Sequence, residues 1–244
     1  GMMWSSAGSL IFQAIRILTQ VILARLLWPE AFGLIALVMA FVSVSNYLVD
    51  NGLTLFLVRK QELEENDAYS LFMSNFVFSI GMMVLLVISS PWIAVYLEEP
   101  SIALLLSVSS VAIVINASGS VHKALLTREL RFKEQTLGML IATLVAGFIA
   151  ILSSVLGAGV WSLVIYNVGY QLLFTGSIIL IYPLKISGQL NRLFIRSAVF
   201  YSWKLMLSGL IHTVYENIFN IIMGMMFSVS TLGFYSNALK IRDG

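Results

Sequence analysis

Long apolar stretches are the feature of this sequence that most constrains its fold. A helix needs about 20 mainly apolar residues to cross the core of a bilayer, and the stretches reach that length. Only 11% of the residues are charged, against about 25% in soluble domains. We therefore predict an all-α, multi-pass transmembrane helix bundle, with spans near 6–27, 33–57, 69–95, 101–121, 136–156, 160–182 and 200–226 and a further one that begins near Leu232.

Lysine and arginine gather in alternate connections between these spans. The connections near 59–68, 122–135 and 183–199 contain several, whereas 97–100, 157–159 and 228–231 contain none. Because cytoplasmic connections carry the excess of Lys and Arg in membrane proteins, this alternation predicts a cytoplasmic N-terminus.

The short outer connections argue against a catalytic domain outside the membrane, and so against a membrane-bound polymerase or ligase. The sequence contains no cysteine, no nucleotide-binding loop, no cluster of metal ligands and no nucleophile–base pair. His122 and His212 stand alone, and an isolated histidine is more often a packed residue than a metal ligand. We expect a protein that is not an enzyme, without a metal, a cofactor or a nucleic-acid partner.

Polar residues recur at helical spacing inside four of the spans. Residues three, four or seven positions apart share one face of a helix, so each set forms a stripe. The stripes are Gln13, Arg16 and Gln20; Ser43, Asn46 and Asp50; Asn167, Gln171 and Thr175; and Lys204, Ser208, His212, Glu216 and Asn220, with Asn217 beside Glu216.

These stripes have two interpretations. They line a polar cavity if their helices are neighbours, or they join helices, since Ser, Thr, Asn and Gln often form hydrogen bonds between helices. Arg16 has no acid within its own span, although Asp50 or Glu216 of another helix is able to pair with it. An arginine in a membrane cavity suits a phosphate or diphosphate, which a guanidinium binds through two hydrogen bonds. The residues alone predict a transporter with a partly cationic cavity.

The chain also resembles a known family. Its recurring features are "ARLLWPEAFGL" (24–34), "DNG" (50–52) followed by "LVRK", "ALLTRELRFKEQ" (124–135), "GAGVWSLV" (157–164) and "SWKLMLSGLIHTVYENIFNIIMG" (202–224). In their order and spacing these features resemble the bacterial polysaccharide flippases. These are the O-antigen and capsule exporters of the multidrug/oligosaccharidyl-lipid/polysaccharide exporter superfamily.

The resemblance implies two six-helix bundles around a central cavity in the bacterial cytoplasmic (inner) membrane. It implies transport of undecaprenyl-diphosphate-linked oligosaccharide between leaflets by alternating access, with the lipid-linked sugar, the bilayer, and a polysaccharide polymerase and glycosyltransferases as partners. Two positions depart from the family. Phe219 stands where members often carry an acid, and Thr19 and Gln20 stand where the related lipid II flippases have an Arg-Asp pair.

A two-bundle family predicts an internal repeat. Residues 20–38 align with 220–238 at an offset of 200, with Ile22/Ile222 and Gly33/Gly233 identical. We therefore expect an N-terminal six-helix bundle over 1–184. Residues 185–244 would hold the cytoplasmic connection, the seventh helix and the start of the eighth, with the second bundle truncated.

Three alternatives to a lipid-linked oligosaccharide flippase remain open at this point. A cation-coupled multidrug exporter would use acids and aromatic residues, for which Asp50, Glu216, Tyr166, Tyr170 and Tyr215 are available. A membrane enzyme is disfavoured by the short outer connections. A non-catalytic scaffold of a polysaccharide assembly system would be recognised by lost assembly with intact lipid transport.

Overall fold

The computed structural model describes residues 2–50, 56–58, 65–183, 188–226 and 229–242. Within these ranges the regular structure is helical, which confirms the predicted all-α fold. The helices are α1 (Met2–Leu26), α2 (Pro29–Asp50), α4 (Glu65–Tyr96), α5 (Ser101–Ser109), α6 (Val111–Arg128), α7 (Phe132–Val155), α8 (Trp161–Ile181), α9 (Arg192–Met226) and α10 (Val229–Arg242).

Six segments in the described part of the chain are long and apolar enough to cross a membrane. They are Gly8–Leu26, Pro29–Val49, Asn66–Tyr96, Ser101–Arg128, Phe132–Val155 and Trp161–Ile181. These overlap the first six predicted spans, so the chain is a multi-pass membrane protein. Two bounds differ: α2 begins at Pro29 instead of residue 33, and α6 continues to Arg128, inside the predicted 122–135 connection.

The last two helices differ from the prediction. α9 covers the predicted seventh span but begins at Arg192, so the end of the predicted 183–199 connection is helical. α9 is not among the six segments above. α10 begins at Val229 instead of near Leu232. Helix boundaries inside a polar stretch are set by tertiary contacts, which hydropathy does not record.

The predicted fourth span consists of two consecutive helices, α5 and α6, that meet at Ser110. Serine hydroxyls bond to the backbone on the α5 side of this junction. The Ser110 hydroxyl donates to the carbonyl of Ser107 at 2.7 Å, and the Ser107 hydroxyl donates to the carbonyl of Ala103 at 2.7 Å.

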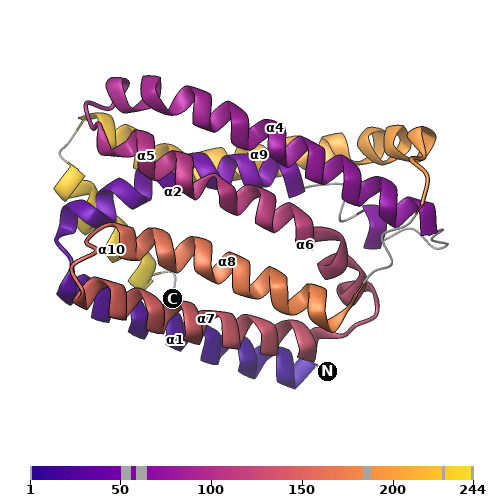
Figure 1. Ribbon diagram of the computed structural model, residues 1–244, viewed down its shortest axis with the longest axis horizontal. Coiled ribbons are helices and arrows are strands. Elements are labelled where there is room, and N and C mark those ends of the chain that lie inside the picture. The colour runs from indigo at the N-terminus through magenta and orange to yellow at the C-terminus, as the bar shows by residue number, and fades with distance from the viewer. Residues whose placement is uncertain (1, 51–55, 59–64, 184–187, 227–228, 243–244) are drawn as a thin grey trace.

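The helices form an antiparallel bundle in which α2 is central (Figure 1). α1 lies along α7, α7 along α8, and α8 along α6; α4 covers α5 and α6, while α9 and α10 pack on α2. The largest apolar cluster of the described residues joins α2, α5, α6 and α8 with Leu232 of α10. α10 therefore belongs to the same core as the first six spans.

The two ends of the bundle differ in charge. One end, here called the basic end, holds the α6–α7 turn and the start of α9, with Lys123, Arg128, Arg131, Arg192 and Arg196. The other, here called the opposite end, holds the α1–α2, α4–α5 and α7–α8 turns. The last of these turns uses Gly157 and Gly159 at φ of 87° and 56°, a conformation that glycine adopts without strain.

The start of α9 is fastened to α4 at the basic end. The backbone N–H of Gln189 donates to Oδ1 of Asn66 at 2.9 Å, and that of Asn191 donates to the hydroxyl of Ser70 at 2.8 Å. Phe194 packs in an apolar cluster with residues of α4 and α6, and its ring lies 5.6 Å from that of Phe56. Directional bonds and buried rings together fix this junction.

Candidate functional site

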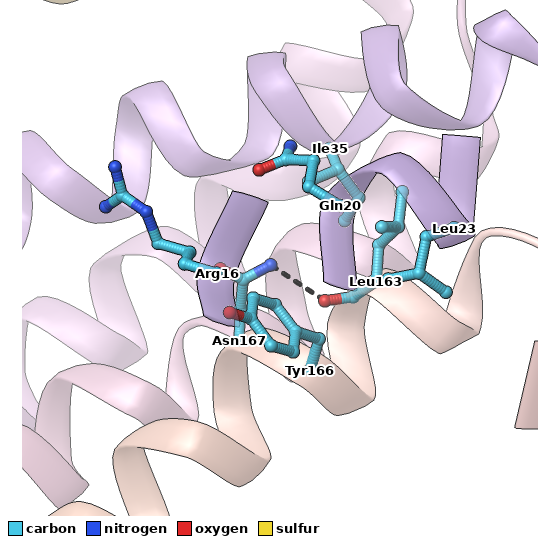
Figure 2. A pocket seen from close by; sticks show the side chains of 7 residues that line it. All are labelled: Arg16, Gln20, Leu23, Ile35, Leu163, Tyr166 and Asn167. Carbon is cyan, nitrogen blue, oxygen red and sulfur yellow. Dashed lines mark hydrogen bonds between the residues drawn. The ribbon is translucent and has the colours of Figure 1, made fainter. Parts of the chain in front are cut away.

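A cavity of about 160 Å³ lies between α1, α2 and α8. Its walls combine apolar side chains with an arginine, two amides and a tyrosine (Figure 2). The lining residues are Arg16, Gln20 and Leu23 of α1, Ile35 of α2, and Leu163, Tyr166 and Asn167 of α8. The structure therefore brings together three of the residues predicted from the sequence, Arg16, Gln20 and Asn167.

Arg16 and Asn167 are held differently. The Asn167 amide donates from Nδ2 to the carbonyl of Leu163 at 2.7 Å, which anchors it to its own helix (Figure 2). Arg16 is half-buried, and its guanidinium carbon lies 5.9 Å from the centre of the Phe12 ring. In Figure 2 the guanidinium extends to one side of the cavity, away from Tyr166. Arg16 therefore contributes a positive charge to the wall of the cavity, next to the amide of Gln20.

A network of amides joins α2, α6 and α8, one helical turn along α8 from this cavity. Asn116 of α6 donates from Nδ2 to Oδ1 of Asn46 on α2 at 3.4 Å. Gln171 of α8 donates from Nε2 to Oδ1 of Asn116 at 2.8 Å and to the hydroxyl of Thr175 at 3.2 Å. Gln171 follows Asn167 by one helical turn, so the α8 stripe joins the cavity to this network. Asn46 and Gln171 were predicted as cavity residues, and here they connect three helices.

Asn116 was missed in the sequence analysis. It stands in "VAIVINASGSV" (111–121), where an amide interrupts an apolar run inside a span. Such a residue requires a polar partner in the membrane, and that signal was sufficient to include it. Tyr166 was considered only for the drug-exporter alternative, yet it lines the same cavity as Arg16.

Residues predicted on the seventh span lie elsewhere. Lys204 and His212 of α9 are exposed, and the Lys204 ammonium lies 5.7 Å from the ring centre of Trp203. Asn217 donates to the carbonyl of Thr213 at 2.8 Å within α9, and Asn220 is half-buried. None of these residues is among those that line the cavity of Arg16. Gln13 is half-buried on α1, one turn before Arg16.

The predicted ion pairs of Arg16 involve Asp50 and Glu216, whose side chains lie outside the described part of the structure. Among the side chains that are described, Arg16 has no carboxylate within salt-bridge distance. Within the same residues no group of three His, Asp or Glu is placed to hold a metal ion.

Thr19 and Gln20, which stand at the Arg-Asp position of the lipid II flippases, face different surroundings. Gln20 lines the cavity. Thr19 is buried against α7, where a Cβ added to Gly147 would lie 2.9 Å from its hydroxyl oxygen. Its hydroxyl donates to the carbonyl of Ile15 at 2.9 Å. Only Gln20 of this pair is therefore available to a ligand in the cavity.

A polar cluster lies outside the membrane-spanning segments at the basic end. The Tyr182 hydroxyl donates to Oε1 of Glu129 at 2.6 Å. This bond and, second, partial burial raise the pKa of Tyr182 above its ordinary value. Arg131 donates from Nε to Glu134 at 3.1 Å, which raises the pKa of its guanidinium. The cluster joins the α6–α7 turn to the end of α8.

The chain is similar to a known protein family and to individual bacterial membrane proteins. A family model described as polysaccharide biosynthesis protein matches residues 22–243. The succinoglycan biosynthesis transport protein ExoT of Rhizobium meliloti (strain 1021) is 28% identical over 160 residues, which are 66% of this chain and 32% of that protein. An uncharacterized membrane protein in the cps region of Klebsiella pneumoniae is 23% identical over 129 residues, 53% of this chain and 27% of that protein. The aligned stretches thus span about a third or less of these relatives. No solved structure matches the chain.

Proposed function

The chain belongs to the polysaccharide biosynthesis protein family, and from this we propose that it is part of a membrane transporter that flips undecaprenyl-diphosphate-linked oligosaccharide across the bacterial inner membrane. The match to a succinoglycan transport protein supports transport as the role in polysaccharide synthesis. Flipping leaves every covalent bond of the substrate intact, so the proposed protein is not an enzyme.

The observation that carries the proposal is the position of Arg16. A charged side chain near the middle of a membrane costs roughly 2.5–3.5 kcal/mol on insertion scales, so such residues usually serve a function. Arg16 lies beside a cavity with Gln20 and Asn167, whose amides both donate and accept hydrogen bonds. This combination suits a diphosphate joined to a sugar, because the guanidinium binds the phosphate oxygens and the amides bind neighbouring hydroxyls.

The proposed transport cycle uses two bundles that alternately open the cavity to each leaflet. Residues 1–184 form the first bundle in this proposal, and 185–244 begin the second. The basic end faces the cytoplasm with the N-terminus, in keeping with its lysines and arginines. A polysaccharide polymerase and glycosyltransferases are the partners that would use or supply the lipid-linked sugar.

The test is delivery of undecaprenyl-diphosphate oligosaccharide to the far leaflet of liposomes that contain the full-length protein. Arg16→Ala should slow delivery roughly ten- to a hundredfold, as expected when a charge-assisted hydrogen-bond pair is lost. Arg16→Lys should retain part of the rate, because the charge remains but the two-point contact does not. Arg25→Ala is the matched control, since Arg25 lies on the same helix but does not line the cavity.

If the wild type and Arg16→Ala are both folded and deliver the lipid equally fast, Arg16 does not bind the substrate, although the transport function itself stands. No delivery by the wild type would overturn the flippase function. If a strain that lacks the protein loses polysaccharide assembly but still transports the lipid-linked sugar, the scaffold function is favoured.

A cation-coupled multidrug exporter is the second candidate function. Tyr166 lines the cavity, and on the same two helices, α1 and α8, the rings of Phe12 and Tyr170 lie 6.2 Å apart. Aromatic faces attract organic cations. Transport of organic cations by the same liposomes, without delivery of the lipid-linked sugar, would select this candidate.

A further inference from the structure

Two glycines at equivalent positions of the internal repeat predicted from the sequence meet in the structure. Gly33 lies near the start of α2 and Gly233 near the start of α10, at the offset of 200 that relates the two segments. A Cβ added to Gly33 would overlap the carbonyl oxygen of Val229, and a Cβ added to Gly233 would overlap that of Pro29. Pro29 and Val229 are themselves equivalent at this offset. The contact is therefore reciprocal, with each helix placing its first carbonyl against the glycine of the other.

This contact is made by backbone against backbone. Glycine allows two helices to approach more closely than any other residue does. The residues that directly precede the glycines, Phe32 and Leu232, are 1% and 0% exposed. These two residues are also equivalent at the offset of 200. A methyl group at either glycine meets a main-chain carbonyl, which cannot rotate away as a side chain can. The contact therefore tolerates only glycine while the helices stay in place.

We propose that Gly33 and Gly233 form a symmetric latch that holds the opposite end of the bundle closed, and that the latch separates when substrate leaves at that end. The inference rests on the proposed transport function, because a flippase must open its cavity at each end in turn. It adds which residues close this end, and it predicts that the two halves of the repeat contribute equally.

The contacts at the two ends differ, and the difference favours movement of α10 relative to α2 over movement of α9 relative to α4. At the basic end, α9 is fastened to α4 by hydrogen bonds of 2.9 Å and 2.8 Å to Asn66 and Ser70 and by the packed ring of Phe194. At the opposite end, α10 packs on α2 through the two glycines and through apolar side chains such as Leu232, contacts that have no fixed direction. Tilting of α9 and α10 about the fastened junction would separate Gly33 from Gly233 without breaking the bonds at the basic end.

The latch can be tested by cysteine accessibility, because these 244 residues contain no cysteine; any cysteine elsewhere in the full-length protein is first replaced by serine. Ser236 and Ala36 are equivalent in the repeat, lie three residues beyond the glycines, and are 4% and 8% exposed. Ser236→Cys and Ala36→Cys, made separately in the full-length protein in membranes, should react slowly with a membrane-impermeant maleimide. Adding Gly33→Ala or Gly233→Ala should raise the reaction rate roughly tenfold, and by similar factors, because overpacking disfavours the closed arrangement.

Gly81→Ala and Gly176→Ala are the matched controls, since a Cβ at these glycines has no neighbour within 4 Å. The proposal is overturned if folded Gly33→Ala and Gly233→Ala variants react no faster than these controls. It is also overturned if only one of the two accelerates the reaction. This readout needs no substrate, so a failed latch and a failed flippase are distinguishable.

A second measurement covers the case in which the alanine variants do not fold. Pro29→Cys and Val229→Cys, at positions whose backbone carbonyls each contact the glycine of the other helix, are combined in an otherwise wild-type chain and bridged by a cleavable cross-linker. Delivery of undecaprenyl-diphosphate oligosaccharide should stop on bridging and return on cleavage. Undiminished delivery by the bridged protein would overturn the latch.

Discussion

Gln171 of α8 donates a hydrogen bond to Asn116 of α6 at 2.8 Å, and Asn116 donates onward to Asn46 of α2 at 3.4 Å. Side-chain amides thereby join three helices in a part of the bundle whose other buried residues are mainly apolar. Hydrogen bonds between membrane helices contribute about 0.6 kcal/mol on average and up to about 2 kcal/mol. The network therefore both positions the α8 stripe and stabilises the bundle.

Gln171→Leu should destabilise the protein by about 1 kcal/mol, because it leaves polar groups of Asn116 and Thr175 without this partner. Thermal unfolding in detergent measures the change. Asn116→Leu combined with Gln171→Leu should cost less than the two single changes together, and simple additivity would contradict the coupling. Ser89→Ala is the control, since the Ser89 hydroxyl bonds to the backbone of its own helix, to the carbonyls of Leu85 at 2.7 Å and Leu86 at 3.3 Å.

Gly147→Ala should displace α1, because the new Cβ would lie 2.9 Å from the hydroxyl oxygen of Thr19 and 3.1 Å from its methyl carbon. We expect a loss of about 1–3 kcal/mol in stability and reduced transport, since Arg16 lies one turn away on α1. Thr19→Ala should restore much of both in the double variant by removing the atoms that collide. A double variant no better than Gly147→Ala would show that this contact does not position α1.

Tyr182 should make stability depend on pH in the alkaline range. Its pKa is raised above 10.0 in the folded protein by the hydrogen bond to Glu129. Above about pH 10 the unfolded chain loses this proton before the folded chain does, so stability falls as pH rises through the folded pKa. Tyr182→Phe should remove this part of the slope, as measured by unfolding midpoints at several pH values. An unchanged slope would show that Tyr182 does not contribute.

Leu130→Gly should stabilise the α6–α7 turn. Leu130 has φ of 57°, in the left-handed region that a side chain disfavours, and relief of that strain exceeds the entropic disadvantage of glycine by up to about 1 kcal/mol. Leu130→Ala keeps the Cβ and should bring no such gain. Thermal unfolding of the two variants compares them, and equal midpoints would contradict the strain at this position.

The sequence allowed much of the fold to be predicted and less of the candidate site. The first six predicted spans overlap the six membrane-crossing segments because each had to be apolar over a bilayer-crossing length, a property that hydropathy records directly. Their exact ends, and the break between α5 and α6, were not predicted. The start of α9 at Arg192 was not predicted, since it depends on contacts with Asn66 and Ser70 more than 100 residues earlier in the chain. Helical spacing placed Arg16 and Gln20 on one face, but it did not indicate that α8 lies opposite them.

The amino-acid sequence by itself determined that the chain is an all-α membrane protein whose connections rich in Lys and Arg lie at one end, because water, lipid and charge act on each segment separately. The tertiary structure decided which stripes meet. In the folded chain Arg16 and Asn167 line the same cavity, Asn116 bonds to amides of two other helices, and Gly33 contacts the backbone of α10. These relationships depend on how helices distant in the chain pack against each other, and local periodicity carries no information about the neighbour that a helix face will find.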